Sequence, residues 1–191
     1  MPRCSKVACG TSDGLIHIVD VGAPRGAPGS SSGAGVTART FATGPNSAVA
    51  CIASPRASAC TELPVGAFNV FASLHGGGDP SVRLWDARSS RDAQVASLRG
   101  HKGMALSGLV GSRNLLAFSP CARYLGVAAI DGAWIYDLRK LNAVARLDPR
   151  TGTEFNGPRA SEDGVVGIEW VPTRPGVCLL TSRGVLSMWS P

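Results

Sequence analysis

The sequence predicts an all-β protein made of many short strands joined by tight turns. Its 191 residues include 24 glycines and 13 prolines, spread through the chain. So many residues that reverse the chain favour short strands over long helices. With 44% hydrophobic and 17% charged residues, the chain can bury a core and lacks the polarity of a disordered protein.

A repeated pattern of strand-length segments supports this prediction and divides the chain into units. Each unit contains a segment that ends in an aromatic or apolar residue followed by Asp or Ser. The four copies are residues 14–20, 80–86, 132–137 and 184–190. The first three copies follow turns that contain Asp13, Asp79 and Asp131, and an Asp-containing turn between two apolar segments is typical of a β-hairpin.

Further strands are expected upstream within each unit. The strand directly before the turn is predicted at residues 7–9, 70–74, 124–129 and 177–181. An earlier strand, which ends in a turn containing Pro, is predicted at residues 49–55, 115–120 and 165–172. Residues 115–118 and 177–180 do not alternate cleanly between apolar and polar, so both faces of these strands are expected to be covered.

The order of these segments resembles that of the WD-repeat family, and Leu84-Trp85-Asp86 and Gly100-His101 match its motifs closely. The resemblance implies four-stranded antiparallel blades of a β-propeller that form a single domain over residues 1–191. It covers about three and a half blades, from near the second strand of one blade to the third strand of another. We therefore expect an incomplete propeller, either a fragment or an arc completed by the rest of a longer chain or by a partner.

Residues 23–35 lie in the longest interval between two copies of the repeat. They form a tract of Gly, Pro, Ser and Ala with the composition of a flexible linker. We expect this tract to be a flexible insertion within the propeller domain.

The resemblance also implies structural roles for polar residues, because WD repeats contain a buried network of a turn Asp, a His, a Ser or Thr and a Trp. The structural repeat positions are Asp79, Trp85, Asp86, His101, Asp131, Tyr136, Asp137 and Trp189. The network is expected to be fragmentary, since the second unit has no Gly-His pair before it and the third has Tyr136 in place of Trp. His101 at the family's own His position is expected to be structural.

No group of residues predicts catalysis, a metal site or a cofactor site. Residues 29–33 match the G-x-S-x-G motif and residues 75–78 match the HGGG motif of esterases. However, the serine tract has low complexity, and His75 begins a predicted hairpin loop. The six cysteines form no CxxC pair and have no His at zinc-finger spacing. We expect a protein that is not an enzyme.

The leading functional prediction is a scaffold that binds other proteins of a multisubunit complex through its loops and faces. Trp85-Asp86-Ala87-Arg88 and Tyr136-Asp137-Leu138-Arg139 also resemble the tandem WDxR endings of substrate receptors of cullin-RING ubiquitin ligases. That resemblance implies that Arg88 and Arg139 lie on one face of the propeller and contact an adaptor protein. A receptor of this type is the first alternative.

The second alternative is a subunit of an RNA-processing complex. The net charge is +6, and basic loop residues could contact phosphate groups: Arg25, Arg39, Lys102, Arg113 and Arg150. Only 6% of residues are aromatic, so the support for nucleic-acid binding is weak. The sequence has no apolar segment long enough to span a membrane and no signal for secretion, and an intracellular protein of the cytoplasm or nucleus is expected.

Overall fold

The computed structural model describes residues 6–20, 37–44, 47–55, 69–76, 80–89, 93–102, 114–148, 164–172 and 175–190. Within these ranges the chain forms strands and no α-helix, which confirms the predicted all-β class. No helix in the described ranges is therefore long and apolar enough to cross a membrane. The expected flexible tract at 23–35 and the turn residue Asp79 lie outside the described residues.

The described strands form four antiparallel sheets, and within each sheet the strands follow one another in chain order. The first sheet contains β1 (Lys6–Gly10), β2 (Leu15–Asp20) and β3 (Thr37–Ala42). The second sheet contains β4 (Val49–Ala53), β5 (Val70–His75), β6 (Val82–Asp86) and β7 (Gln94–Leu98). The third sheet contains β8 (Leu116–Phe118), β9 (Tyr124–Ala129), β10 (Gly132–Asp137) and β11 (Asn142–Leu147). The fourth sheet contains β12 (Val165–Trp170), β13 (Val177–Thr181) and β14 (Leu186–Trp189).

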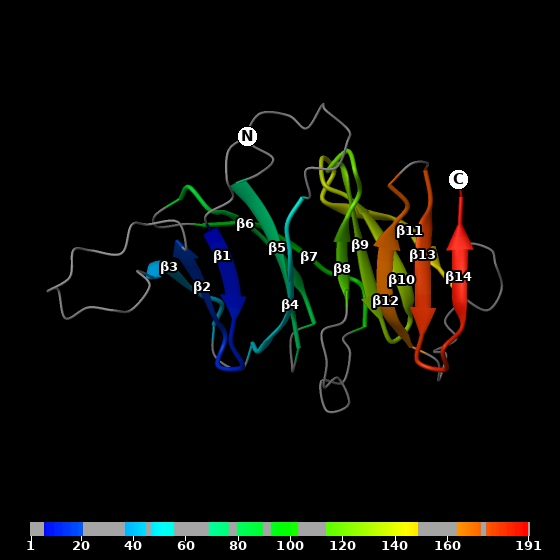
Figure 1. Cartoon of the computed structure of the whole chain (residues 1–191), viewed down its shortest axis with the longest axis horizontal. Coiled ribbons are helices and arrows are strands. Elements are labelled where there is room, and N and C mark those ends of the chain that lie inside the picture. The colour runs from blue at the N-terminus through cyan, green and yellow to red at the C-terminus, as the bar shows by residue number, and fades with distance from the viewer. Residues whose placement is uncertain are drawn as a thin grey trace, which may run out of the picture.

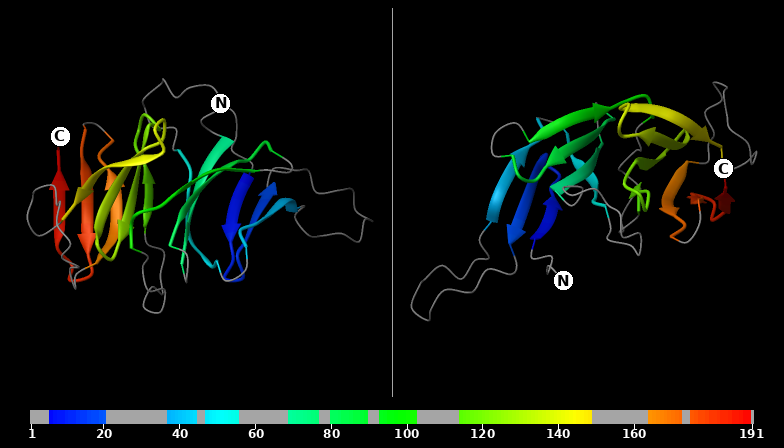
Figure 2. Two further views of the ribbon diagram at one scale, coloured as in Figure 1. Left: turned by 180° about the vertical axis from the view of Figure 1, so that it is seen from behind. Right: turned by 90° about the horizontal axis from the view of Figure 1, so that it is seen from above.

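The four sheets stand side by side in an arc (Figures 1 and 2). Strands β1, β4, β8 and β12 contact one another in succession along the arc. β7 and β11 lie on its convex side, as the view from above shows (Figure 2). The described strands do not close into a ring. In Figure 1, β1 and β13 run toward one end of the molecule and β14 runs toward the other, so equivalent turns gather on two opposite rims.

The hairpin turns explain why glycine follows Asp in two of the units. Gly14 and Gly132 have φ angles of 84° and 127°, a region that favours glycine. At Gly132 a Cβ atom would lie 2.8 Å from the carbonyl oxygen of Leu147, which is closer than real Cβ atoms approach backbone. These turns thus need glycine both for their conformation and for the close passage of the neighbouring chain.

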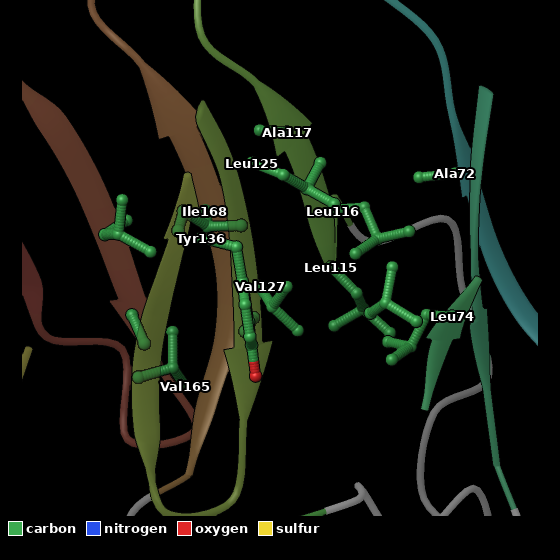
Figure 3. Packing of buried hydrophobic residues seen from close by; sticks show 14 of the residues in the cluster. Ala72, Leu74, Leu115, Leu116, Ala117, Leu125, Val127, Tyr136, Val165 and Ile168 are labelled. Carbon is green, nitrogen blue, oxygen red and sulfur yellow. The ribbon is translucent and has the colours of Figure 1, made fainter. Parts of the chain in front are cut away.

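The core lies between the sheets and joins the second, third and fourth sheets in one apolar cluster (Figure 3). Leu125 and Val127 on β9 are fully buried in it. A second cluster joins the first and second sheets and includes Phe41, Phe71 and Trp85. Because apolar side chains cover both faces of the inner sheets, their strands show the continuous apolar sequences expected of strands buried on two sides.

Glycines on the facing strands allow the sheets to approach closely. A Cβ atom at Gly126 would lie 2.5 Å from Cδ1 of Ile168 on the fourth sheet. A Cβ atom at Gly10 would lie 2.3 Å from Cγ1 of Val49 on the second sheet. Each glycine therefore provides the space that a branched side chain of the next sheet fills.

Removal of the side chain at the centre of this packing tests the fold. We expect Leu125→Ala to reduce the free energy of unfolding by about 2–5 kcal/mol, because it leaves a cavity in a buried cluster. Val95→Ala is the matched control, since Val95 is 62% exposed and its loss is expected to cost less than about 0.5 kcal/mol. Equal effects in urea denaturation would contradict this packing.

Candidate functional site

The turns that follow β6 and β10 place the two candidate partner-binding arginines in matching positions. The Oδ1 atom of Asp86 accepts a hydrogen bond of 2.8 Å from the backbone N–H of Arg88. The Oδ1 atom of Asp137 accepts one of 2.8 Å from the backbone N–H of Arg139. A short Asp side chain that binds the backbone two residues later ends a strand in a defined turn. Both arginine side chains are exposed at this point.

Arg88 folds back onto the carboxylate of its own turn. Its Nη2 atom lies 2.8 Å from Oδ2 of Asp86, and its side chain is 64% exposed. The hydrogen bond from the Arg88 side chain lowers the pKa of Asp86 to about 2, and the backbone N–H of Arg88 adds to this effect. An ion pair this exposed contributes little to stability. The Asp86–Arg88 ion pair instead sets the position of the Arg88 guanidinium.

Asp137 differs from Asp86 because its carboxylate is buried and pairs with another arginine. Nη2 of Arg123 lies 3.0 Å from Oδ2 of Asp137, which is 2% exposed. The pKa of Asp137 is lowered, first by the hydrogen bond from the Arg139 backbone and then by Arg123. Arg123 takes the place that Arg88 takes in the second sheet, and the guanidinium of Arg139 remains on the exposed surface of the turn.

An exposed apolar residue completes the turn after β10. Leu141 is 47% exposed and has a φ angle of 54°, in the left-handed region that residues other than glycine seldom adopt. Its backbone N–H donates a hydrogen bond of 2.8 Å to the carbonyl of Asp137. The turn thus presents an exposed leucine two residues after Arg139.

Arg39 on β3 connects the first sheet to the turn after β6. Its Nη1 atom donates hydrogen bonds of 2.7 Å to the carbonyl of Ala87 and 3.0 Å to the carbonyl of Ser89. Both carbonyls flank Arg88. The sequence suggests Arg39 as a possible phosphate contact, but in the structure its guanidinium binds backbone carbonyls of the neighbouring sheet.

Trp85 belongs to a buried chain of hydrogen bonds in the second sheet. Its Nε1 atom donates to Oγ of Ser73 over 2.7 Å. Oγ of Ser73 lies 2.6 Å from Nε2 of His75, and Nδ1 of His75 lies 2.9 Å from Oγ of Ser47. All four side chains are at most 4% exposed. These hydrogen bonds satisfy polar groups that would otherwise be costly to bury. His75 is therefore part of the buried framework of the second sheet.

The repeat pattern alone does not assign His75 and Ser47 to this network. A signal for His75 is nevertheless present, because side chains at alternate positions of a strand share one face. Phe71, Ser73 and His75 therefore face the same side of β5, and Trp85 lies opposite Phe71 on β6. The distant contribution of Ser47, which precedes β4, follows only from the packed structure.

In the third sheet, His101 and Tyr136 form a different arrangement. Nδ1 of His101 lies 3.0 Å from the hydroxyl of Tyr136, which donates a hydrogen bond of 3.1 Å to the carbonyl of Arg99. Burial lowers the pKa of His101, and the nearby carboxylate of Asp131 partly opposes this shift. Burial also raises the pKa of Tyr136. The tyrosine that replaces the expected Trp thus still reaches the histidine.

Asp131 lies in the turn between β9 and β10, on the other rim of the arc from Arg139, and binds several groups there. Its Oδ1 atom accepts hydrogen bonds of 3.1 Å from Nε1 of Trp134 and from the backbone N–H of Lys102. Nη2 of Arg146 lies 3.6 Å from its Oδ2 atom. Nε2 of His101 has no hydrogen-bond partner among the described residues, so Asp131 acts on that ring through its charge. Asp131 therefore holds Trp134 and the backbone of Lys102 by hydrogen bonds.

Trp189 occupies the position in the fourth sheet that Tyr136 occupies in the third. It lies opposite Val177 on β13, as Tyr136 lies opposite Leu125 on β9. Its side chain is half-buried, and within the described part of the chain its Nε1 atom has no hydrogen-bond partner. Among the described residues, Trp189 therefore has no counterpart of the hydrogen bonds that Trp85 and Tyr136 make.

The described residues contain few groups suited to chemistry. No cluster of three or more His, Cys, Asp or Glu side chains within the described ranges could hold a metal ion. Cys51 lines a cavity between β4 and β8 together with Leu116 and Phe118. Burial raises the pKa of its thiol, which disfavours the nucleophilic thiolate.

Comparison with known proteins assigns no family to the chain. No model of a known protein family matches it, and no curated protein matches it. The functional conclusion therefore depends on the chemistry and position of the residues described above.

The hydrogen bond from Trp85 to Ser73 can be tested by a double-mutant cycle. We expect Trp85→Ala to cost about 3–5 kcal/mol of stability because a buried aromatic side chain is lost. Trp85→Phe is expected to cost about 1–3 kcal/mol, and Ser73→Ala to cost less in the Trp85→Phe variant than in the wild type. Additive effects in chemical denaturation would show that the two side chains are not coupled.

The lowered pKa of His101 predicts a dependence of stability on pH. Below pH 6.5 the unfolded state binds a proton at this residue before the folded state does. Neutral His101 therefore makes its full contribution to the unfolding free energy above pH 6.5. This contribution is lost as the pH falls toward the pKa of His101 in the folded state. We expect His101→Gln to flatten the fall in unfolding free energy between about pH 7 and pH 5. Parallel curves for the two proteins would contradict this assignment.

Proposed function

We propose that the chain is part of a WD-repeat-type β-propeller that acts as a non-catalytic scaffold for protein–protein interactions inside the cell. Four sheets of consecutive antiparallel strands, placed side by side in an arc, are compatible with radial repetition of blades. The match between Trp85, Tyr136 and Trp189 in strand position supports the same repeat. A scaffold of this kind binds through turns that its rigid sheets hold in place.

The buried polar residues support a structural role over a catalytic one. His75 and His101 are 1% and 4% exposed and have hydrogen-bonding partners in the framework of the second and third sheets. A general base must reach the proton that it removes from a substrate. Side chains this deeply buried are poorly placed for that task, so binding is the better-supported function.

The observation that carries the proposal is the matched geometry of the turns that hold Arg88 and Arg139. Both follow an Asp that closes the turn with a bond of the same length, and both side chains are exposed. Because β6 and β10 are equivalent strands, their following turns lie on the same rim of the arc. Exposed guanidinium groups can form paired hydrogen bonds with carboxylates or carbonyls of a partner.

The same geometry favours a more specific second candidate, a substrate receptor of a cullin-RING ubiquitin ligase. In that case Arg88 and Arg139 would contact the adaptor protein of the ligase. Support for the RNA-processing alternative is weaker, since Arg39 binds backbone carbonyls and Lys102 lies on the opposite rim, next to Asp131. The other basic residues of that alternative, Arg25, Arg113 and Arg150, lie outside the described residues.

A paired charge-removal experiment tests the role of this rim. The double substitution Arg88→Ala and Arg139→Ala is expected to weaken co-purification of a partner about thirtyfold, as an arginine hot spot worth about 2 kcal/mol predicts. The control is Lys102→Ala with Arg183→Ala, which removes the same charge from exposed positions on the opposite rim. Affinity is measured by quantitative pulldown, and thermal melting confirms that both variants remain folded.

The outcomes separate the candidate functions. Loss of a ubiquitin-ligase adaptor only in the arginine variant supports the receptor. Loss of other proteins only in that variant supports a general scaffold that binds through this rim. Reduced RNA affinity with a smaller salt dependence would favour the RNA-processing subunit instead. Equal binding by both variants and the wild type would remove the rim from the binding site.

A further inference from the structure

One strand of every sheet carries a pair of apolar residues that faces in the same direction along the arc. The pairs are Ile16 and Ile18 on β2, Val82 and Leu84 on β6, Ala133 and Ile135 on β10, and Leu186 and Met188 on β14. The strand registers establish this equivalence. Ile135 lies opposite Gly126, which faces the fourth sheet, and Met188 lies opposite Cys178 at the corresponding position of β13.

The next sheet covers the first three pairs. Ile16 and Ile18 are 0% and 5% exposed and pack in the cluster that contains Phe71 of the second sheet. Val82 and Leu84 are 0% and 4% exposed and share a cluster with Leu115. The third pair is at most 7% exposed, and the same cluster contains Val165 and Ile168 of the fourth sheet. The same kind of interface between one sheet and the next thus occurs three times.

The fourth pair is exposed. Leu186 is 72% exposed and Met188 is 57% exposed. Leu180, which lies opposite Leu186 on β13, is 41% exposed. Leu180 and Leu186 define the free face of the fourth sheet. An apolar surface of this kind is favourable to bury, and on the other three sheets the equivalent surface is an interface.

The first sheet has a free face of the complementary kind. Gly10 faces the second sheet, so its neighbour Cys9 points to the other side. Cys9 is exposed, and Val7 on the same side is 46% exposed. In the third and fourth sheets the equivalent side chains are Val127 and Leu179, which are fully buried against the preceding sheet. Val7 and Cys9, together with their cross-strand neighbours Val19 and His17, define the free face of the first sheet.

We propose that the free face of the fourth sheet binds the free face of the first sheet of a second copy of this chain. The contact would continue an interface that the molecule already forms three times, between surfaces of the same two kinds. It is a head-to-tail contact, which produces a ring if the rotation closes and a filament if it does not. The described parts of two copies contain eight sheets, and sheets repeated around an axis close at about four to eight. The expected assembly is therefore a closed dimer. This proposal does not depend on whether the arginine rim, formed by the turns that hold Arg88 and Arg139, binds a partner.

The test is the oligomeric state of the full chain in sedimentation velocity over a range of concentrations. We expect a dimer for the wild type. Leu186→Lys and Val7→Lys should each raise the dissociation constant at least about thirtyfold, because each places a charge in the contact. Val95→Lys is the control, since this residue is 62% exposed on β7 and lies outside both free faces. All three changes are at exposed positions and are expected to preserve the circular dichroism spectrum.

Mixing the two disrupted variants distinguishes this contact from non-specific aggregation. The Leu186→Lys variant keeps an intact first-sheet face, and the Val7→Lys variant keeps an intact fourth-sheet face. An equimolar mixture should therefore form a 1:1 pair through one intact contact, although each variant alone is monomeric. A monomeric wild type, continued self-association of Leu186→Lys, or a mixture that stays monomeric would overturn the proposal. In the first case the free face is open to another protein or to a further segment of a longer chain.

Discussion

The structure depends on the close packing of apolar faces between successive sheets. Each sheet is thin and cannot bury its own side chains, so it becomes stable only when a neighbour covers it. Gly10 and Gly126 show how tight this contact is, because the side chains of Val49 and Ile168 occupy the space where a Cβ atom would lie. Because this contact repeats from sheet to sheet, equivalent strands lie in matching positions and their turns gather on one rim of the arc.

Buried polar groups are hydrogen-bonded in different ways in the second and third sheets. Around Trp85 the hydrogen bonds pass through Ser73 to His75, whereas around Tyr136 they run to His101 and to the carbonyl of Arg99. Both arrangements give the polar group of the aromatic residue a partner, although Nε2 of His101 has none among the described residues. The repeat therefore preserves the position of an aromatic residue with a polar group and leaves its partners free to vary.

The sequence predicted the inner strands of each sheet well because their signals are local, but it set no bounds for β3, β7 and β11. Asp-Gly turns and strand-length apolar segments mark β2, β5, β9 and β10 close to their observed bounds. It also placed Asp86 and Asp137 where two strands end. It did not identify Arg123 as the partner of Asp137 or the contacts of Arg39 with the second sheet, because these pairs join residues whose proximity only the packing creates. The identity of the partner protein leaves no comparable pattern in the sequence.

The turn that carries Arg88 is attached to two sheets. It is the end of a hairpin of the second sheet, but its two flanking carbonyls are held by Arg39 of the first sheet. A change in the spacing or angle between these sheets must therefore stretch those hydrogen bonds or carry the turn along with it. By linkage, a ligand that fixes the turn also restrains the angle between the sheets, so occupation of the rim and the curvature of the arc influence each other.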